Sequence, residues 1–229
     1  MDTLDTHDHT CRFAASNIVS AVYGGQPIQK DHPIIKWTND FMYRIIRAAL
    51  PGEFLVEIFP VMLHLPNWMA RWKAETLKWH QDATVVFQNL LEVVRQKKQN
   101  GQARPCFAAH LLENHAEALS NKEMAWLAGT MLGAGAETTA AALEVFMLAM
   151  TLYPVVLRKA QAEIDEVVGP YRMSTFSDRD KLPYINAIVK EVLRWRPVGP
   201  IGVARRSLAD DWYKGYFIPK GSIVLYNVW

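Results

Sequence analysis

A short polar sequence interrupts a long apolar run, and it is the part of the chain best suited to do chemistry. Residues 133–139 read Gly-Ala-Gly-Ala-Glu-Thr-Thr and lie midway along the apolar stretch from Met124 to Tyr153. A glycine costs a helix interior about 1 kcal/mol relative to alanine, and a buried carboxylate needs a partner. The pattern therefore favours a site where another molecule, such as a flat cofactor, approaches the backbone closely and meets Glu137 and Thr138.

A second chemically distinct pair lies about fifty residues further along the chain. Glu191 and Arg194 belong to a segment that opens near Pro183 and ends at Pro197, which is typical of a helix. Their three-residue spacing places both side chains on one helix face, where they can form a charge-assisted pair. Because many surface helices carry such pairs, this one by itself is a weak signal of function.

In this order and at this spacing, the two motifs resemble those of the cytochrome P450 family of haem-thiolate monooxygenases. Residues 134–139 match the family's oxygen-activating pattern, and residues 190–194 match its ExxR helix. Residues 210–222 are similar to the hairpin that follows that helix, and residues 227–229 to the start of the next segment. The resemblance implies a mainly α, cytochrome P450-like helical fold, present in part, with a small β region near the C-terminus.

The resemblance extends upstream to residues 54–60 and 65–68, which are similar to a stretch of fungal members, so it covers nearly the whole chain. The family's haem iron is held by a cysteine in a loop that bears glycine and arginine. Cys11 and Cys106 are the two cysteines of this chain, and neither lies in such a loop. We therefore expect residues 1–229 to be the central part of a single domain, truncated at both ends, without the N-terminal part, the thiolate cysteine or any other metal ligand.

The resemblance also implies roles for individual residues of the first motif. Ala134 and Gly135 would lie over the haem face, where small side chains leave room for dioxygen and substrate. Thr138 would be the alcohol that relays protons to oxygen, and Glu137 would supply or gate those protons. A structural alternative exists for both: a threonine hydroxyl bonded back to a carbonyl one turn earlier, and a buried carboxylate satisfied by hydrogen bonds.

Other residues receive implied roles around the cofactor. Arg206 would bind a haem propionate, since a guanidinium group matches a carboxylate, although Arg205 beside it leaves open which arginine serves. Glu191 and Arg194 would form a structural anchor behind the haem. The substrate wall would include Val198, Ile201 and Val203, for which an apolar lead-in to a strand is an equally good description.

The activity implied by the resemblance is the insertion of one oxygen atom of O2 into a small apolar organic substrate. Haem would be the cofactor, and an NADPH-dependent reductase would supply the electrons. Similarity to fungal members suggests secondary metabolism and, for a full-length protein, attachment to the endoplasmic reticulum membrane through an N-terminal anchor. The alternative is a truncated helical remnant that binds no haem and has no catalytic activity.

Composition agrees with a globular chain. Half of the 229 residues are hydrophobic, and 25 Lys and Arg against 23 Asp and Glu give a formal net charge of +2, which makes no case for a nucleic-acid partner. The N-terminus is acidic and is followed by no signal-like apolar segment, so neither signal nor anchor is expected in this chain, which would be soluble or unassigned. The run from Met124 could span a membrane by its length, but Glu137 and Glu144 favour a buried helix instead.

Apolar periodicity and helix boundaries predict a largely helical chain. Residues 7–9, His-Asp-His, are expected to form a solvated tail, since they are too few to enclose a metal. A capping box is predicted at Ser120 to Glu123. Strand character is expected only after Pro197, at residues 203–206, 216–218 and 223–225. Helices are predicted at residues 13–23, 32–49, 68–99, 107–118, 120–153, 154–168 and 183–196.

Overall fold

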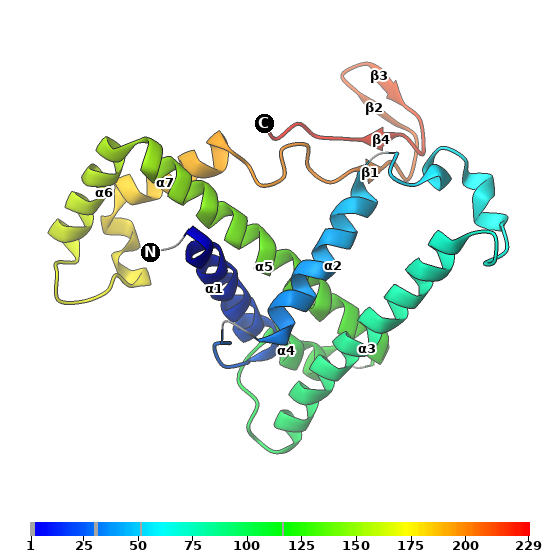
Figure 1. Ribbon diagram of the computed structural model, residues 1–229, viewed down its shortest axis with the longest axis horizontal. Helices are drawn as coiled ribbons and strands as arrows, with labels where there is room; N and C mark the ends of the chain where they lie inside the picture. Colours follow the sequence, from blue (N-terminus) through cyan, green and yellow to red (C-terminus); the bar gives the residue numbers. More distant parts are fainter. Residues whose placement is uncertain (1–2, 30–31, 51, 116) are drawn as a thin grey trace. The chain divides into compact units, whose positions relative to one another are not determined.

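The computed structural model describes residues 3–29, 32–50, 52–115 and 117–229 (Figure 1). The chain is mainly α-helical with a few short strands near the C-terminus, which confirms the predicted fold class. It divides into two compact units, residues 1–140 and 141–229, and the boundary falls within one long helix.

The first unit consists of helices that alternate with short loops. Its last helix starts at the predicted capping box, because the Ser120 hydroxyl accepts a hydrogen bond from the Glu123 N–H at 3.2 Å and the Glu123 carboxylate accepts one from the Ser120 N–H at 2.8 Å. The elements are α1 (Thr3–Tyr23), α2 (Pro33–Ala49), the 3₁₀ helices η1 (Leu55–Glu57) and η2 (Pro60–His64), α3 (Arg71–Gln99), α4 (Phe107–Asn114) and the first part of α5 (Asn121–Leu152).

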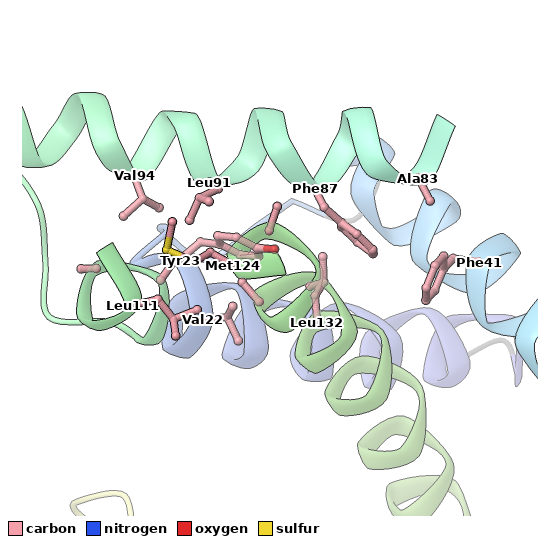
Figure 2. Close-up of a cluster of buried hydrophobic side chains, with 14 residues drawn as sticks. Val22, Tyr23, Phe41, Ala83, Phe87, Leu91, Val94, Leu111, Met124 and Leu132 are labelled. Carbon is pink, nitrogen blue, oxygen red and sulfur yellow. The ribbon is translucent and has the colours of Figure 1, made fainter. Parts of the chain in front are cut away.

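An aromatic cluster around Phe87 of α3 forms the core of this unit. The Phe87 ring is fully buried and makes edge-to-face contacts with Trp37, Phe41 and Trp126, at centroid distances of 5.3, 5.4 and 5.2 Å. Figure 2 shows its side chain projecting from α3 toward Phe41 and Leu132. These rings and the aliphatic side chains around them form the hydrophobic core that joins α1 to α5 in this unit.

The second unit combines two packed helices with two small antiparallel ribbons. Strand β1 pairs with β4, and β2 pairs with β3 across a turn in which Lys214 and Gly215 both have positive φ, as a type I′ turn requires. The elements are the remainder of α5, α6 (Pro154–Val167), the 3₁₀ helix η3 (Phe176–Lys181), α7 (Pro183–Trp195), β1 (Arg205–Arg206), β2 (Asp211–Tyr213), β3 (Tyr216–Ile218) and β4 (Ile223–Val224).

Polar contacts hold the segments around α7. The Glu163 carboxylate of α6 accepts hydrogen bonds from the backbone N–H groups of Tyr184 and Ile185, each at 2.9 Å, and so satisfies two free donors in the first turn of α7. In the segment before α7, Asp178 accepts two hydrogen bonds from the Arg172 guanidinium at 2.7 and 2.8 Å. Both contacts join residues whose pairing is not evident from local sequence patterns.

The main departure from the predicted elements is at the N-terminus. Helix α1 begins at Thr3, so the prediction of a solvated tail at residues 7–9 is wrong. Local contacts support the extra turns: the Thr10 hydroxyl bonds to the His7 carbonyl at 2.8 Å, and the Cys11 sulfur lies 3.7 Å from the His7 ring. The other helix boundaries agree within a few residues, and the strand expected at 203–206 is limited to Arg205–Arg206.

Candidate functional site

The candidate site is built on the middle of α5, where neighbouring side chains point to different sides. Ala134 and Thr138 are exposed and lie one turn apart, so they share a face. One and two turns earlier the same face carries the exposed apolar side chains of Met131 and Leu127. The result is an exposed, largely apolar helix face with a small residue at its centre and a hydroxyl beside it. Glu137 is adjacent but points to another side.

The Thr138 hydroxyl is held by its own helix. It donates a hydrogen bond to the Ala134 carbonyl at 2.6 Å, which is the structural alternative considered for this residue. A hydroxyl has one donor and two acceptor lone pairs. With its proton directed at the Ala134 carbonyl, Thr138 offers acceptor capacity to a group on the exposed face and has to rotate in order to donate.

Glu137 occupies a more enclosed position. Its Oε2 atom is buried and has no hydrogen-bond partner among the described residues, and burial raises the pKa of this carboxyl above its ordinary value. A cavity of about 10 Å³ adjoins it, lined among others by Cys11 of α1 and by Thr38 and Asn39 of α2. The alternative of a carboxylate satisfied by hydrogen bonds, like the role in proton supply, stays a prediction for Glu137.

The two glycines of the motif are explained by packing. A Cβ atom on Gly133 would lie 3.1 Å from the Phe41 ring, and one on Gly135 would lie 2.5 Å from the Ile18 side chain. Gly135 is therefore small because α1 packs against it. The expected contact of Gly135 with a haem face stays a prediction, whereas Ala134 lies on the exposed face.

The predicted residues of the second unit form a separate set. Arg206 lies on β1, and its guanidinium nitrogen is 3.3 Å from the position that a Cβ on Gly221 would take. Neither Arg205 nor Arg206 pairs with a carboxylate among the described residues, so both guanidinium groups can bind an anion. The structure does not distinguish which of the two arginines would do so.

Glu191 and Arg194 form the predicted pair on α7. The guanidinium donates two hydrogen bonds to the carboxylate at 2.7 and 2.6 Å. This pairing lowers the pKa of Glu191 and raises that of Arg194. The pair is solvent-exposed, as are the substrate-wall residues Val198, Ile201 and Val203. Their assigned roles remain predictions.

The cysteines lie in the first unit. Cys11 is on α1 beside the cavity at Glu137, and Cys106 is the residue that precedes α4. Thr38 and Asn39, the polar residues that α2 contributes to this cavity, were not identified from the sequence. In the sequence, they stand out only as polar residues within a helix that carries apolar residues on both sides of them. This difference does not indicate which side chain they contact.

One helix in the described part of the chain, α5, is long and apolar enough to cross a membrane by length and composition. Less than a quarter of its most apolar window is buried. The core helix of a soluble protein passes the same test, so this finding is weak evidence for a membrane span.

Comparison with known proteins decides the family. The family model described as cytochrome P450 matches residues 2–229. The chain belongs to the cytochrome P450 family. It is 58% identical over 223 residues to cytochrome P450 monooxygenase 58 of Postia placenta, and 46% identical over 222 residues to a cytochrome P450 monooxygenase of Armillaria gallica. It is also 41% identical over 217 residues to cytochrome P450 monooxygenase iboC of Amanita muscaria.

These matches cover nearly all of this chain but less than half of each relative. The alignments include 94% to 96% of the chain and 38% to 43% of the relatives' own length. The family and its fold are thereby shown for residues 2–229, and the resemblance found from the motifs is confirmed. The matches do not show the activity of the whole protein.

The family implies a haem cofactor, and the residues present fit one in part. The face of α5 around Ala134 is exposed and largely apolar, and the small side chain of Ala134 permits the close approach that a porphyrin needs. Arg205 and Arg206 have the charge and planar donor geometry that suit a propionate. Ala134 would leave room at a haem face and one of the two arginines would bind a propionate; none of these residues is an iron ligand.

Proposed function

We propose that the protein represented by this chain is a haem-dependent monooxygenase that oxidises a small apolar organic substrate. O2 would be the oxidant, and an NADPH-dependent reductase would supply the electrons. The observation that carries the proposal is the placement of Ala134 and Thr138 together on an exposed apolar face of α5, with Glu137 adjacent in sequence. Haem, when bound, supplies the reductive activation of dioxygen.

Thr138 would act through its hydroxyl at the oxygen-binding face. Because the hydroxyl donates to the Ala134 carbonyl, its lone pairs are available to accept a hydrogen bond from a protonated group on that face. Rotation about the Cβ–Oγ bond would turn the hydroxyl proton toward an acceptor on that face. Thr138 therefore has the chemistry to hold a proton donor in place and to pass a proton on.

Glu137 would hold the proton that Thr138 passes on. Its raised pKa makes the protonated form more abundant near neutral pH than for an exposed glutamate, which suits a proton donor. Ala134 would leave room for dioxygen and the substrate. Arg206 or Arg205 would bind a propionate, and Val198, Ile201 and Val203 would offer apolar contacts to the substrate.

The relatives support the class of reaction but not its details. Each of the three relatives above carries the name monooxygenase and comes from a fungus. We therefore propose a role in fungal secondary metabolism and, for the full-length protein, a location at the endoplasmic reticulum membrane. We also propose that residues 1–229 form the central part of one P450 domain, with Glu191 and Arg194 as a structural anchor.

The proposal is tested by expressing the chain together with the coding sequence that flanks it in the transcript. We expect the reduced protein with carbon monoxide to give the spectrum of a thiolate-ligated haem. With NADPH, a reductase and a panel of small apolar compounds, we expect substrate-dependent oxygen consumption and a hydroxylated product. A protein that folds but binds no haem would contradict the proposal and favour the non-catalytic remnant.

A matched pair of variants tests the role of the alcohol. Thr138→Ala should lower product formation on the order of 100-fold while NADPH oxidation continues and hydrogen peroxide is released, because the proton relay is lost. Thr139→Ala, one residue on and also exposed, is the control and should behave as the wild type. Equal activity of the two variants would remove Thr138 from the site.

A further inference from the structure

The cavity beside Glu137 is small and mixed in character. Its volume of about 10 Å³ lies between α1, α2 and α5, within the first unit. The lining includes apolar side chains and three residues with polar or sulfur-bearing side chains besides Glu137: Cys11, Thr38 and Asn39. A volume of this size holds about one water molecule.

A buried oxygen atom of Glu137 is the reason to expect a bound water molecule in this cavity. Its Oε2 atom is fully buried and has no hydrogen-bond partner among the described residues. Leaving a buried carboxylate oxygen unpaired is unfavourable, and such groups are usually satisfied by protein or by buried water. A buried water needs two to four polar partners, and a carboxylate, a hydroxyl and an amide at one cavity meet that number.

We propose that this cavity binds one water molecule, which Asn39 and Thr38 of α2 hold against the Oε2 atom of Glu137. The water donates one hydrogen bond to Oε2 and the other to a side-chain oxygen of α2, and it accepts one from the Asn39 amide or the Thr38 hydroxyl. Asn39 is exposed whereas Thr38 is buried, so the water lies between solvent and the carboxyl. Asn39 is thus a positioning residue that controls how Glu137 exchanges protons with solvent.

The groups that face the cavity from each helix are few. Helix α1 contributes the Cys11 thiol, whose sulfur lies 3.7 Å from the imidazole of His7, and α2 contributes only uncharged side chains. On α5, Glu137 is the one lining group with a carboxylate. No cationic side chain lines the cavity among the described residues, so a water held there would stabilise the ionised form of Glu137 by a hydrogen bond.

The water site deepens the proposed function, since a proton held at Glu137 is the one that Thr138 would pass on. It can be tested without haem or substrate. The protein is labelled with ¹³C at the glutamate carboxyls, the Glu137 resonance is identified by its loss in Glu137→Gln, and its titration is followed by NMR. The variants Asn39→Leu and Thr38→Val remove the amide and the hydroxyl at nearly constant size.

Each of these two variants should raise the pKa of Glu137 by about half to one pH unit, because the ionised form loses its hydrogen-bonded water. The matched control is Asn89→Leu on α3, an exposed asparagine outside the cavity, which should titrate as the wild type. A titration of Asn39→Leu that coincides with the wild type would overturn the proposal.

A second measurement on the wild-type protein keeps the test independent of variant folding. A long-lived water should give cross-relaxation with the side-chain amide protons of Asn39, and its absence would overturn the proposal. A positive result together with no haem binding would leave the water site in place and remove the proposed function. If the water signal is absent but the enzyme is active, the water site is disproved and the proposed function stands.

Discussion

The two units of this chain are stabilised by different kinds of contact. The first unit buries a continuous cluster of aromatic and aliphatic side chains around Phe87. The second has a smaller apolar cluster between α5, α6 and α7, and beside it two carboxylates join neighbouring segments: Asp178 pairs with Arg172, and Glu163 accepts hydrogen bonds at the start of α7. The difference suggests that the first unit responds mainly to changes in packing and the second to changes in charge and pH.

The largest loss of stability is expected from removing the Phe87 ring at the centre of the aromatic cluster. Phe87→Ala should lower the free energy of unfolding by about 3–5 kcal/mol, because it removes a fully buried ring and leaves a cavity. Phe176→Ala in the second unit removes a ring that is 97% exposed and should change the free energy by less than about 0.5 kcal/mol. Urea unfolding followed by circular dichroism measures both, and similar values would contradict the place of Phe87 at the centre of the core of the first unit.

A smaller loss of stability is expected when a methyl group is added inside the same cluster. A Cβ atom on Gly129 would lie 2.3 Å from the Phe87 ring, so Gly129→Ala should destabilise the protein by about 1–3 kcal/mol despite the better helix propensity of alanine. The control is Gly199→Ala, where a Cβ meets no atom within 4 Å. If Gly129→Ala proved neutral under the same conditions, the close contact of α3 with α5 would be wrong.

Much of the first unit follows from local patterns. The capping box at Ser120 and Glu123 and the extent of α5 are set by the order of residues within one segment, and both were predicted from the sequence. The start of α1 was missed because residues 3–12 are polar, and a polar helix gives no apolar periodicity to detect. The exposed face at Ala134 and Thr138 was identified through the family motif.

Contacts between distant segments were not predictable in the same way. Asn39 and Glu137 are almost a hundred residues apart, and Glu163 reaches the N-terminus of α7 from the preceding helix. Polar side chains of this kind have no periodic signature, since their partners are chosen by the packing of whole elements. The packing reason for Gly135 was likewise hidden, because it depends on the position of Ile18 on another helix.

The charged contact before α7 should make the second unit sensitive to acid. The Arg172 guanidinium, together with the Thr175 N–H, holds the pKa of Asp178 well below its ordinary value. Because the folded-state pKa is depressed, this contribution to stability is fully present above the unfolded pKa of about 4 and is lost as pH falls through the folded value.

Asp178→Asn should therefore lower Tm by a few degrees at neutral pH and give a flatter dependence of Tm on pH in the acid range. Asp180→Asn, an exposed neighbour in η3, is the control and should follow the wild-type curve. Thermal unfolding between neutral and acid pH measures all three proteins. Parallel curves for wild type and Asp178→Asn would show that the ion pair does not contribute to the stability of this unit.

The smallest change in Tm is expected from breaking the other bidentate ion pair of the same unit, between Glu191 and Arg194. The side chains of Glu191 and Arg194 are 60% and 71% exposed, whereas that of Asp178 is only 7% exposed. Water screens the exposed pair, so Glu191→Ala should change Tm much less than Asp178→Asn does, with Lys190→Ala on the same helix as the control. If Glu191→Ala proved the more damaging change, exposure would not explain the difference, and the proposed role of the pair as a structural anchor would gain support. The two pairs thus compare a buried charge contact with an exposed one in the same unit.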